Sequence, residues 1–555
     1  MATKKPSETD GPGVESGETL RGYEDASHEN QSFPVDESEM AGMTLFEKKC
    51  HLINKEIDAM GMGKYQWCLW CLCGFGYLLD LLWAQAFGLI LTPIQQELGV
   101  AANQGGNIST SFSAGLTAGA AFWGILVDII GRRWAFNLTC LFSSAFGLGL
   151  AGAMDYTTFL VLTAFVGFGV GGNIPIDTTI ALEFLPQNRR RLLPLLSIFQ
   201  PIGVVCTTAI AYAFIPSRSC DKGLPSCKTS SPGEACCGVS NNIGWRYTLI
   251  TVGCITTAVF LLRFVAFKFH ESPKFLIHRG KDEAAITVIQ KVSKFNGYES
   301  KLTIAHFEAL SNDTASEHSD TPIVDGGNKK SNSGWKKSLN KELDRYKYLF
   351  SNFTLARLTI LVWITYACDF WGFTISGTFT PQILLAKGAA NGLTIYDTYR
   401  SYIYIYLPGI VGVLLGVLGY DLPRVGRQWT MVASSALMAA SLMIFATVNS
   451  QESNIGVSIM EYFFQSTFNS VLYGWTPEVF PSFIRGTACG FASFFGRLFS
   501  IIAPIAAQSL LPPLPPDQIP WESYAKLLYM GGGVAFGATA ALILLPRKIM
   551  AKESM

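Results

Sequence analysis

The stretch from Gly167 to Arg191, which reads GFGVGGNIPIDTTIALEFLPQNRRR, decides how the rest of the chain is interpreted. It is apolar and glycine-rich, carries Asp177 in mid-run, and ends in Glu183, Pro186 and three arginines. Glycine costs a soluble helix about 1 kcal/mol relative to alanine, whereas in a membrane helix it lets a neighbouring helix approach closely. A carboxylate is costly at bilayer depth, so its default interpretation is functional. The stretch therefore predicts a membrane helix that carries part of a site and ends in a charged gate.

The composition of the whole chain supports a membrane protein. Of its 555 residues 49% are hydrophobic and 15% are charged, against roughly 25% charged residues in soluble domains. A formal net charge of +1 removes any electrostatic case for a nucleic-acid partner. The sequence shows no phosphate-binding loop, metal-ligand cluster or nucleophile constellation, so we expect no enzyme activity, no cofactor and no metal.

Apolar segments occur in two groups of six, and each segment is close to the roughly twenty residues that a bilayer requires. They span residues 65–92, 108–130, 134–154, 157–183, 192–215 and 245–268, then 354–378, 400–420, 428–448, 452–475, 485–510 and 523–546. The expected domains are a disordered tail (1–43), an amphipathic lead-in at the membrane surface (44–64), a six-helix bundle (65–268), a polar loop (269–353), a second six-helix bundle (354–546) and a short tail (547–555). The predicted fold class is an all-α membrane protein with twelve transmembrane helices.

Basic residues predict the orientation. Lysines and arginines gather on alternate connections, on the side of both termini and of the 269–353 loop. By the positive-inside rule that side is cytoplasmic, and we expect the plasma membrane. A polar loop on the opposite side contains Cys220, Cys227, Cys236 and Cys237. Disulfides fit an oxidising face better than zinc does, and the three possible pairings stay open.

Internal repetition relates the two groups of helices. Glu183 with Arg190 matches Glu478 with Arg485, because 478 − 183 and 485 − 190 both give 295. Gly131 and Gly426 stand at the same offset, and Asp80 and Asp369 differ by 289. Two six-helix halves related by repetition are typical of a rocking transporter with its site between the halves.

These motifs also resemble a known family. Gly124 to Arg133 (GILVDIIGRR) resembles the loop between helices two and three of the major facilitator superfamily. The E-x-x-P-x-x-x-R pair and the ESPKFL motif at Glu271 resemble its sugar-porter branch. GGNIPIDTTIALEFLP and TPEVFPSFIRGTACGFASFFGR are more similar to the synaptic-vesicle-protein-like branch, which has fungal members and is related to organic ion transporters. The resemblance covers about residues 60–546. The interval from Asp421 to Gly426 is two residues longer than its counterpart, so the second loop departs from the pattern.

Charged residues at the cytoplasmic ends of the helices predict a gate. We expect ion pairs between the halves to hold the inner side shut, because partly desolvated pairs count for more than exposed ones at about 0–1 kcal/mol. The alternative is positive-inside charge with glutamates that reach the headgroups. The predicted gate consists of Asp128, Arg132, Arg133, Glu183, Arg190, Asp421, Arg427, Glu478 and Arg485.

Three carboxylates are expected near mid-depth. Asp80 and Asp369 lie roughly 22 Å into their spans, and Asp177 lies about 9 Å from Glu183. Burial makes proton binding feasible for such groups, and all six histidines lie outside the spans. A coupled proton is therefore expected on a carboxylate. Asp177 has no counterpart in the repeat, since 177 + 295 falls on Leu472. The alternative role for each aspartate is a hydrogen bond between helices.

Arg497 is the expected mid-depth cation, about 18 Å beyond Arg485. It needs a carboxylate from the protein, such as Asp369, or from the substrate. In the organic ion transporters that this branch resembles, an arginine in helix eleven is linked with anionic substrates. Arg263 is expected to reach the headgroups. Further candidates for the wall of the site, or alternatively for hydrogen bonds between helices, are Trp83, Trp371, Asn173 and Asn469.

The sequence thus predicts a monomeric secondary active transporter that works by alternating access. Its expected partners are a small polar organic solute, protons and the lipid bilayer. An organic anion carried by proton symport is the first substrate hypothesis, and a sugar or polyol is the second. An efflux antiporter and a non-transporting nutrient sensor remain as alternatives, and substrate flux in vesicles would separate the sensor from a transporter.

Overall fold

The computed structural model describes residues 40, 43–189, 192–221, 223–231, 233–267, 269–317, 347–422, 426–480, 484–514 and 518–545. The chain divides into two units, residues 1–42 and 43–555, and every helix named below belongs to the second. The tails predicted for 1–43 and 547–555 lie outside the described residues, apart from Met40 and Met43.

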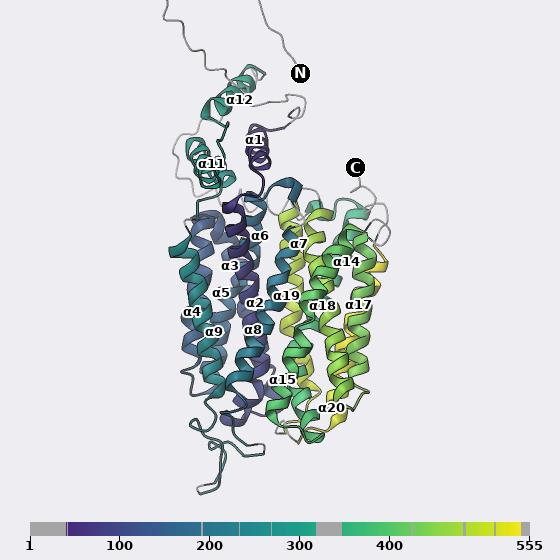
Figure 1. Cartoon of the computed structure of the whole chain (residues 1–555). Coiled ribbons are helices and arrows are strands. Elements are labelled where there is room, and N and C mark those ends of the chain that lie inside the picture. Colours follow the sequence, from purple (N-terminus) through teal and green to yellow (C-terminus); the bar gives the residue numbers. More distant parts are fainter. Residues whose placement is uncertain are drawn as a thin grey trace, which may run out of the picture. The chain divides into compact units, whose positions relative to one another are not determined.

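Twelve helical spans form two halves within the described residues (Figure 1). The first half contains α2 (Lys64–Leu98), α3 (Asn107–Ile130), α4 (Arg132–Leu150), α5 (Tyr156–Gly171) continued by α6 (Asn173–Phe184), α7 (Leu192–Leu195) continued by α8 (Phe199–Phe214), and α9 (Gly244–Leu261) continued by the π-helical turn η5 (Leu262–Ala266). The second half contains α14 (Phe353–Ala390), α15 (Ile395–Tyr406) continued by α16 (Gly409–Asp421), α17 (Gly426–Phe445), α18 (Gln451–Val479), α19 (Arg485–Ser509) and α20 (Trp521–Ile543). The predicted fold class is confirmed.

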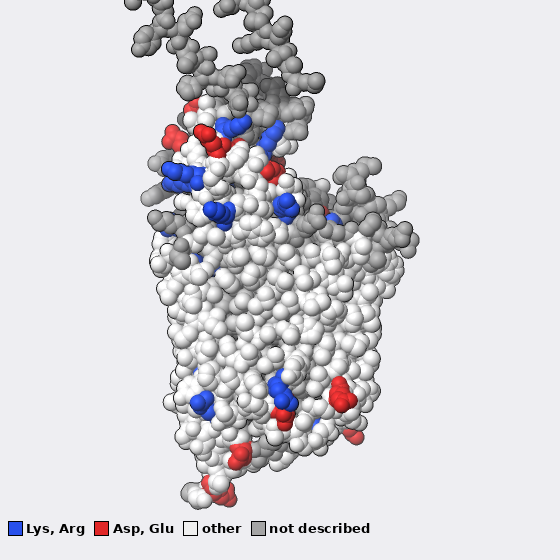
Figure 2. Space-filling view, viewed as in Figure 1, with Lys and Arg blue, Asp and Glu red and all other residues white. Residues whose placement is uncertain are grey.

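The surface of the helices is that of a membrane protein. Among the described residues, ten helical stretches are long and apolar enough to cross a bilayer. The other two spans, α4 and α18, contain more polar side chains. Large apolar side chains such as Val265 and Leu418 stand 71% and 66% exposed, as expected where lipid replaces water. On the face shown in Figure 2, charged side chains gather towards the two ends, and the broad band between them is almost free of charge.

One end of the helices carries a layer of loop helices, which defines the helical-loop face. This layer consists of α1 (Leu45–Met60), α10 (Pro273–His278), α11 (Asp282–Asn296) and α12 (Ile304–Glu317). The apolar side chains Leu52, Ile53 and Ile57 of α1 are buried, and α1 contacts all three of the other helices. The sequence predicted that α1 lies at the membrane surface. The predicted helix is present, but its apolar face packs against the loop helices and is covered by them.

The opposite end, the disulfide face, carries the loop of residues 215–243. Cys220 is bonded to Cys237 and Cys227 to Cys236, which is a nested arrangement among the three pairings that the sequence left open. The loop is fastened to the end of α2, where Asn242 Nδ2 donates to the Pro93 carbonyl oxygen at 2.7 Å.

Packing between the halves differs at the two faces. Towards the disulfide face a single apolar cluster contains residues of both halves, such as Ile90 of α2, Phe379 of α14 and Tyr399 of α15. Towards the helical-loop face each half has a cluster of its own, one around Phe184 and the other around Trp475. The halves therefore share one apolar core towards the disulfide face, whereas towards the other face their cores are separate and α7 packs against α16 and α18.

Two glycines bring the backbones of the two halves into contact. A Cβ atom added to Gly88 of α2 would lie 2.2 Å from the carbonyl oxygen of Gly377 of α14, so the two backbones touch. The two glycines are counterparts in the repeat, because 377 − 88 = 289, the offset of Asp80 and Asp369. Beside them the Tyr399 hydroxyl donates to the Leu89 carbonyl oxygen at 2.7 Å. These contacts hold the two halves together on the disulfide side of the molecule.

Candidate functional site: a cavity between the halves

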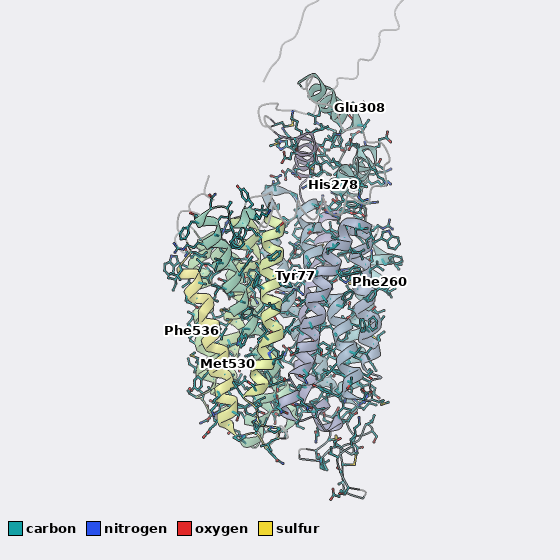
Figure 3. All side chains as sticks on the ribbon, turned by 180° about the vertical axis from the view of Figure 1, so that it is seen from behind. Tyr77, Phe260, His278, Glu308, Met530 and Phe536 are labelled. Carbon is teal, nitrogen blue, oxygen red and sulfur yellow. A yellow bond between two sulfur atoms is a disulfide. The ribbon has the colours of Figure 1, made fainter. Side chains whose placement is uncertain are left out.

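A cavity of about 460 Å³ lies between the halves, within the range of small-molecule sites at roughly 300–1,000 Å³. Helices α2, α3, α6 and α8 of the first half and α14, α15, α18 and α19 of the second supply its walls. Tyr77 on its wall stands where the two halves meet (Figure 3). Its polar lining includes Asp80, Gln85, Gln200, Asp369, Ser376, Gln465, Asn469, Ser493 and Arg497.

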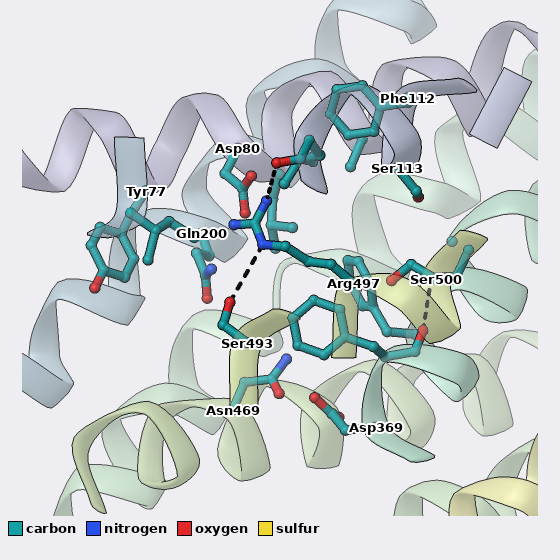
Figure 4. Close-up of a pocket in the computed structure, with 18 of the residues that line it drawn as sticks. Tyr77, Asp80, Phe112, Ser113, Gln200, Asp369, Asn469, Ser493, Arg497 and Ser500 are labelled. Atoms are coloured by element: carbon teal, nitrogen blue, oxygen red, sulfur yellow. Dashed lines mark hydrogen bonds between the residues drawn. The ribbon is translucent and has the colours of Figure 1, made fainter. Parts of the chain in front are cut away.

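Arg497 of α19 reaches across the cavity from one half to the other (Figure 4). It is 5% exposed. Its Nη1 donates to the carbonyl oxygen of Leu116 in α3 at 3.0 Å, and its Nε donates to Ser493 Oγ at 3.4 Å. A guanidinium has five N–H donors, so several remain for a ligand in the cavity.

Two carboxylates share the cavity with Arg497. Asp80 of α2 faces the guanidinium, and the charges of the two groups act on each other. Asp369 of α14 lies on another wall beside Asn469 (Figure 4). The sequence left open whether Arg497 neutralises Asp369, and in the structure it lies by Asp80 instead. These three are the charged groups among the described residues of the lining, so with all of them ionised the lining carries −2 + 1 = −1.

Asp177 is not among the described residues that line the cavity, although Thr178 and Thr179 are. Its Oδ2 accepts a hydrogen bond at 2.9 Å from Nη2 of Arg263, and both side chains are fully buried. Room for this pair comes from Gly76, where an added Cβ atom would lie 1.6 Å from Asp177 Oδ2. The prediction that Arg263 reaches the headgroups is therefore wrong, because its charge is satisfied inside the first half.

Of the other four residues predicted for the wall, one lines the cavity and three do not. Asn469 lines the cavity. Trp83 is buried in the first half and donates from Nε1 to Thr256 Oγ1 at 3.0 Å. Asn173 is buried near Cys140, and Trp371 packs against Phe499. These three are not among the described lining residues.

The charged gate residues pair within each half. Arg132 Nη2 lies 3.5 Å from Glu183 Oε1 in the first half, and Arg427 pairs with Glu478 in the second. Neither pair is the bridge between halves that the sequence predicted, because each arginine begins a helix beside a helix end of its own half. Arg133 is an exposed residue, whereas the side chains of Asp128, Arg190, Asp421 and Arg485 lie outside the described residues.

Glu271 completes the charged cluster of the first half. Its two carboxylate oxygens accept from the backbone N–H groups of Arg132 at 2.8 Å and Arg133 at 3.3 Å, at the start of α4. A carboxylate at a helix N-terminus satisfies free N–H groups and complements the helix dipole. The sequence marked the motif at Glu271 but gave this residue no role.

A fourth intramembrane carboxylate escaped the sequence reasoning. Glu461 of α18 is 5% exposed, and its Oε1 makes no hydrogen bond to the described residues. It stands inside the span predicted for 452–475, so the rule applied to the three aspartates would have found it.

Comparison with known proteins identifies the family. A model described as Major Facilitator Superfamily matches residues 73–504, and the chain belongs to that superfamily. The "MFS siderochrome iron transporter 1" of Ceriporiopsis subvermispora is 34% identical over 92% of this chain and 92% of its own. The "Niacin transporter NiaP" of Acinetobacter baylyi is 22% identical over 89% and 97%. The "Synaptic vesicle 2-related protein" of Xenopus laevis is 24% identical over 83% and 76%.

Among solved structures, the xylose transporter XylE of E. coli in a partially occluded inward-open conformation has the same fold. Its TM-score is 0.61 at 15% identity, with 87% of this chain and 98% of that chain covered. The predicted membership of the superfamily is thus confirmed. The prediction that the protein is a transporter and not an enzyme is confirmed with it. The protein is an integral membrane transporter of a small molecule.

Proposed function

We propose that the protein carries a small organic anion with one carboxylate group across the plasma membrane, together with protons. One observation carries this proposal: Arg497 lies in the central cavity, reaches both halves and bonds neither of the two carboxylates there. A buried arginine with free donors is suited to a carboxylate ligand, which it can bind in a bidentate manner.

The charge of the cavity supports coupling to protons. An anion entering a lining of charge −1 would be repelled by Asp80 and Asp369 at close range. A proton on either carboxylate removes one negative charge, after which Arg497 attracts the anion. Binding of anion and proton would then favour each other, which is what symport requires.

Relatives and surface features supply further support. The niacin transporter among the relatives is named for an aromatic monocarboxylic acid. The positive-inside rule makes the helical-loop face cytoplasmic, and the two disulfides of the opposite face fit an oxidising exterior. In this orientation the disulfide-face contacts keep the cavity shut on the extracellular side.

Uptake into liposomes tests the proposal. The full chain is reconstituted, and radiolabelled nicotinate, lactate and xylose are offered with and without an inward proton gradient. We expect the gradient to accelerate uptake of a monocarboxylate. Arg497→Gln should reduce that uptake about 10- to 100-fold, because a hydrogen bond to a charged group is worth roughly 1.5–3 kcal/mol.

Arg400→Gln is the matched control, since Arg400 is an exposed arginine at 54% exposure that pairs with Asp397. It should leave uptake unchanged. Transport of xylose alone, or anion uptake that Arg497→Gln does not alter, would contradict an anionic substrate.

A further inference from the structure

A row of three polar side chains on α18, here called the file, extends from the cavity along the face of α18 that packs against α14. On α18, Asn469, Gln465 and Glu461 follow one another at intervals of four residues and so share one face of the helix. Asn469 lies beside Asp369 (Figure 4), and Gln465 also lines the cavity. Glu461 is the far end of the file, about 12 Å from Asn469 along the helix and towards the disulfide face.

Glu461 lacks the arginine partner that two other buried carboxylates have, and in this it resembles Asp369, whose Oδ1 also makes no hydrogen bond to the described residues. Glu97 accepts from Arg246 at 2.8 Å, and Asp177 accepts from Arg263 at 2.9 Å. Ser376 of α14 faces Glu461 with its hydroxyl group, and the titratable side chains that interact with it electrostatically are Tyr406 of α15 and the adjacent residue Tyr462. None of these carries positive charge. A buried carboxylate among such neighbours is stable when it holds a proton and costly when ionised.

The turn of α14 that faces Glu461 also forms the closure between the halves. Ser376 faces the carboxyl group, and the next residue, Gly377, touches Gly88 of α2. A second link runs from Tyr406, which interacts with Gln85 of α2 as well as with Glu461. The residue that bonds Glu461, Ser376, is thus the direct neighbour in sequence of Gly377, which makes the contact between the halves.

We propose that Glu461 is the site at which a proton from the disulfide side is loaded, and that its neutral form is required for that side to close. This inference rests on the proposed proton symport and deepens it. Hydronium gives its proton to the carboxylate oxygen and leaves as water, and no bond within the protein breaks. Gln465 and Asn469 then mark the route to Asp369 in the cavity. Position 461 − 295 = 166 is the buried Val166, so Glu461 is not part of the repeated architecture.

Hydrogen–deuterium exchange on the full chain in nanodiscs, without substrate, tests this role. Exchange in the disulfide-face ends of α2 and α14 reports whether that face is closed, and it is followed from acidic to alkaline pH after correction for the intrinsic rate. In the unmodified protein we expect faster exchange, meaning opening, as pH rises. Glu461→Gln should abolish the pH response and hold the face closed. Glu461→Asp, which keeps a carboxylate, should retain the response with a shifted midpoint.

Glu452→Gln is the matched control, because Glu452 is an exposed residue on the first turn of the same helix. It should behave like the unmodified protein. If Glu461→Gln does not fold, Ser376→Ala supplies the test, and its midpoint should shift. A full pH response in Glu461→Gln, an unshifted midpoint in Ser376→Ala, or closure driven by sodium at constant pH would each overturn the inference. Since no substrate is present, these outcomes are independent of the anion-uptake assay.

Discussion

Replacing Gly88 by alanine should open the disulfide face. The added methyl group would lie 2.2 Å from the Gly377 carbonyl oxygen. Ordinary contact begins at 3.4 Å, so α2 and α14 must separate by about 1.2 Å there. We expect this clash to disappear when the halves have parted. The substitution therefore acts on the closed state and spares the open one.

The expected magnitude follows from the cost of overpacking, which is about 1–3 kcal/mol for extra methyl groups in well-packed contacts. That range shifts the ratio of closed to open protein about 5- to 150-fold. A gain in helix propensity of about 1 kcal/mol accompanies any Gly→Ala change in a helix, so a control must share it.

Gly377→Ala is that control. It lies in the helix that faces Gly88, gains the same helix propensity, and its added Cβ atom would have no atom within 4 Å. Hydrogen–deuterium exchange should become faster in the disulfide-face ends of α2 and α14 in Gly88→Ala but not in Gly377→Ala. Equal exchange in the two variants would refute the closure mechanism.

Three further predictions concern stability. Asp177→Ala leaves the Arg263 charge unpaired and should destabilise the first half by about 3–5 kcal/mol. Joint replacement of Asp177 by leucine and Arg263 by methionine should restore much of this loss. Equal melting temperatures of the single and the double variant in nanodiscs would contradict this prediction. Glu271→Gln removes the negative charge at the start of α4 and should lower the stability of that helix end by roughly 0.3–1 kcal/mol. The measurement is amide exchange in the first turn of α4, which should become faster. Unchanged exchange there would refute the capping role. Cys220 and Cys237 lie 17 residues apart, and replacing both by serine should lower the stability of the loop of residues 215–243 by about 3 kcal/mol. Amide exchange should become faster in this loop alone. Exchange that stays slow would show that other contacts hold the loop in place.

The sequence predicted the architecture because its determinants are repeated and local. Apolar runs of bilayer length marked the spans, and a constant offset of 295 related the halves. The same comparison at an offset of 289 pairs Gly88 with Gly377, although a sequence cannot show that two such glycines touch.

The parts of the site that sequence reasoning misplaced depend on contacts between distant residues. Asp177 and Arg263 are 86 residues apart, and their pair needs the space that Gly76 leaves on a third helix. Arg497 was expected at mid-depth and does line the cavity, but whether it lies by Asp80 or Asp369 is set by how the halves pack. Glu461 was within reach of the rule applied to the aspartates and was overlooked.

The most direct test of the central claim records anion uptake and proton entry in the same liposomes. Nicotinate, or another monocarboxylate found active in the uptake assay, is supplied outside with no imposed proton gradient, while a dye inside reports pH. Symport predicts that the lumen acidifies as the anion enters and that Arg497→Gln abolishes both signals. Anion entry without acidification, or with both signals intact in Arg497→Gln, would contradict it.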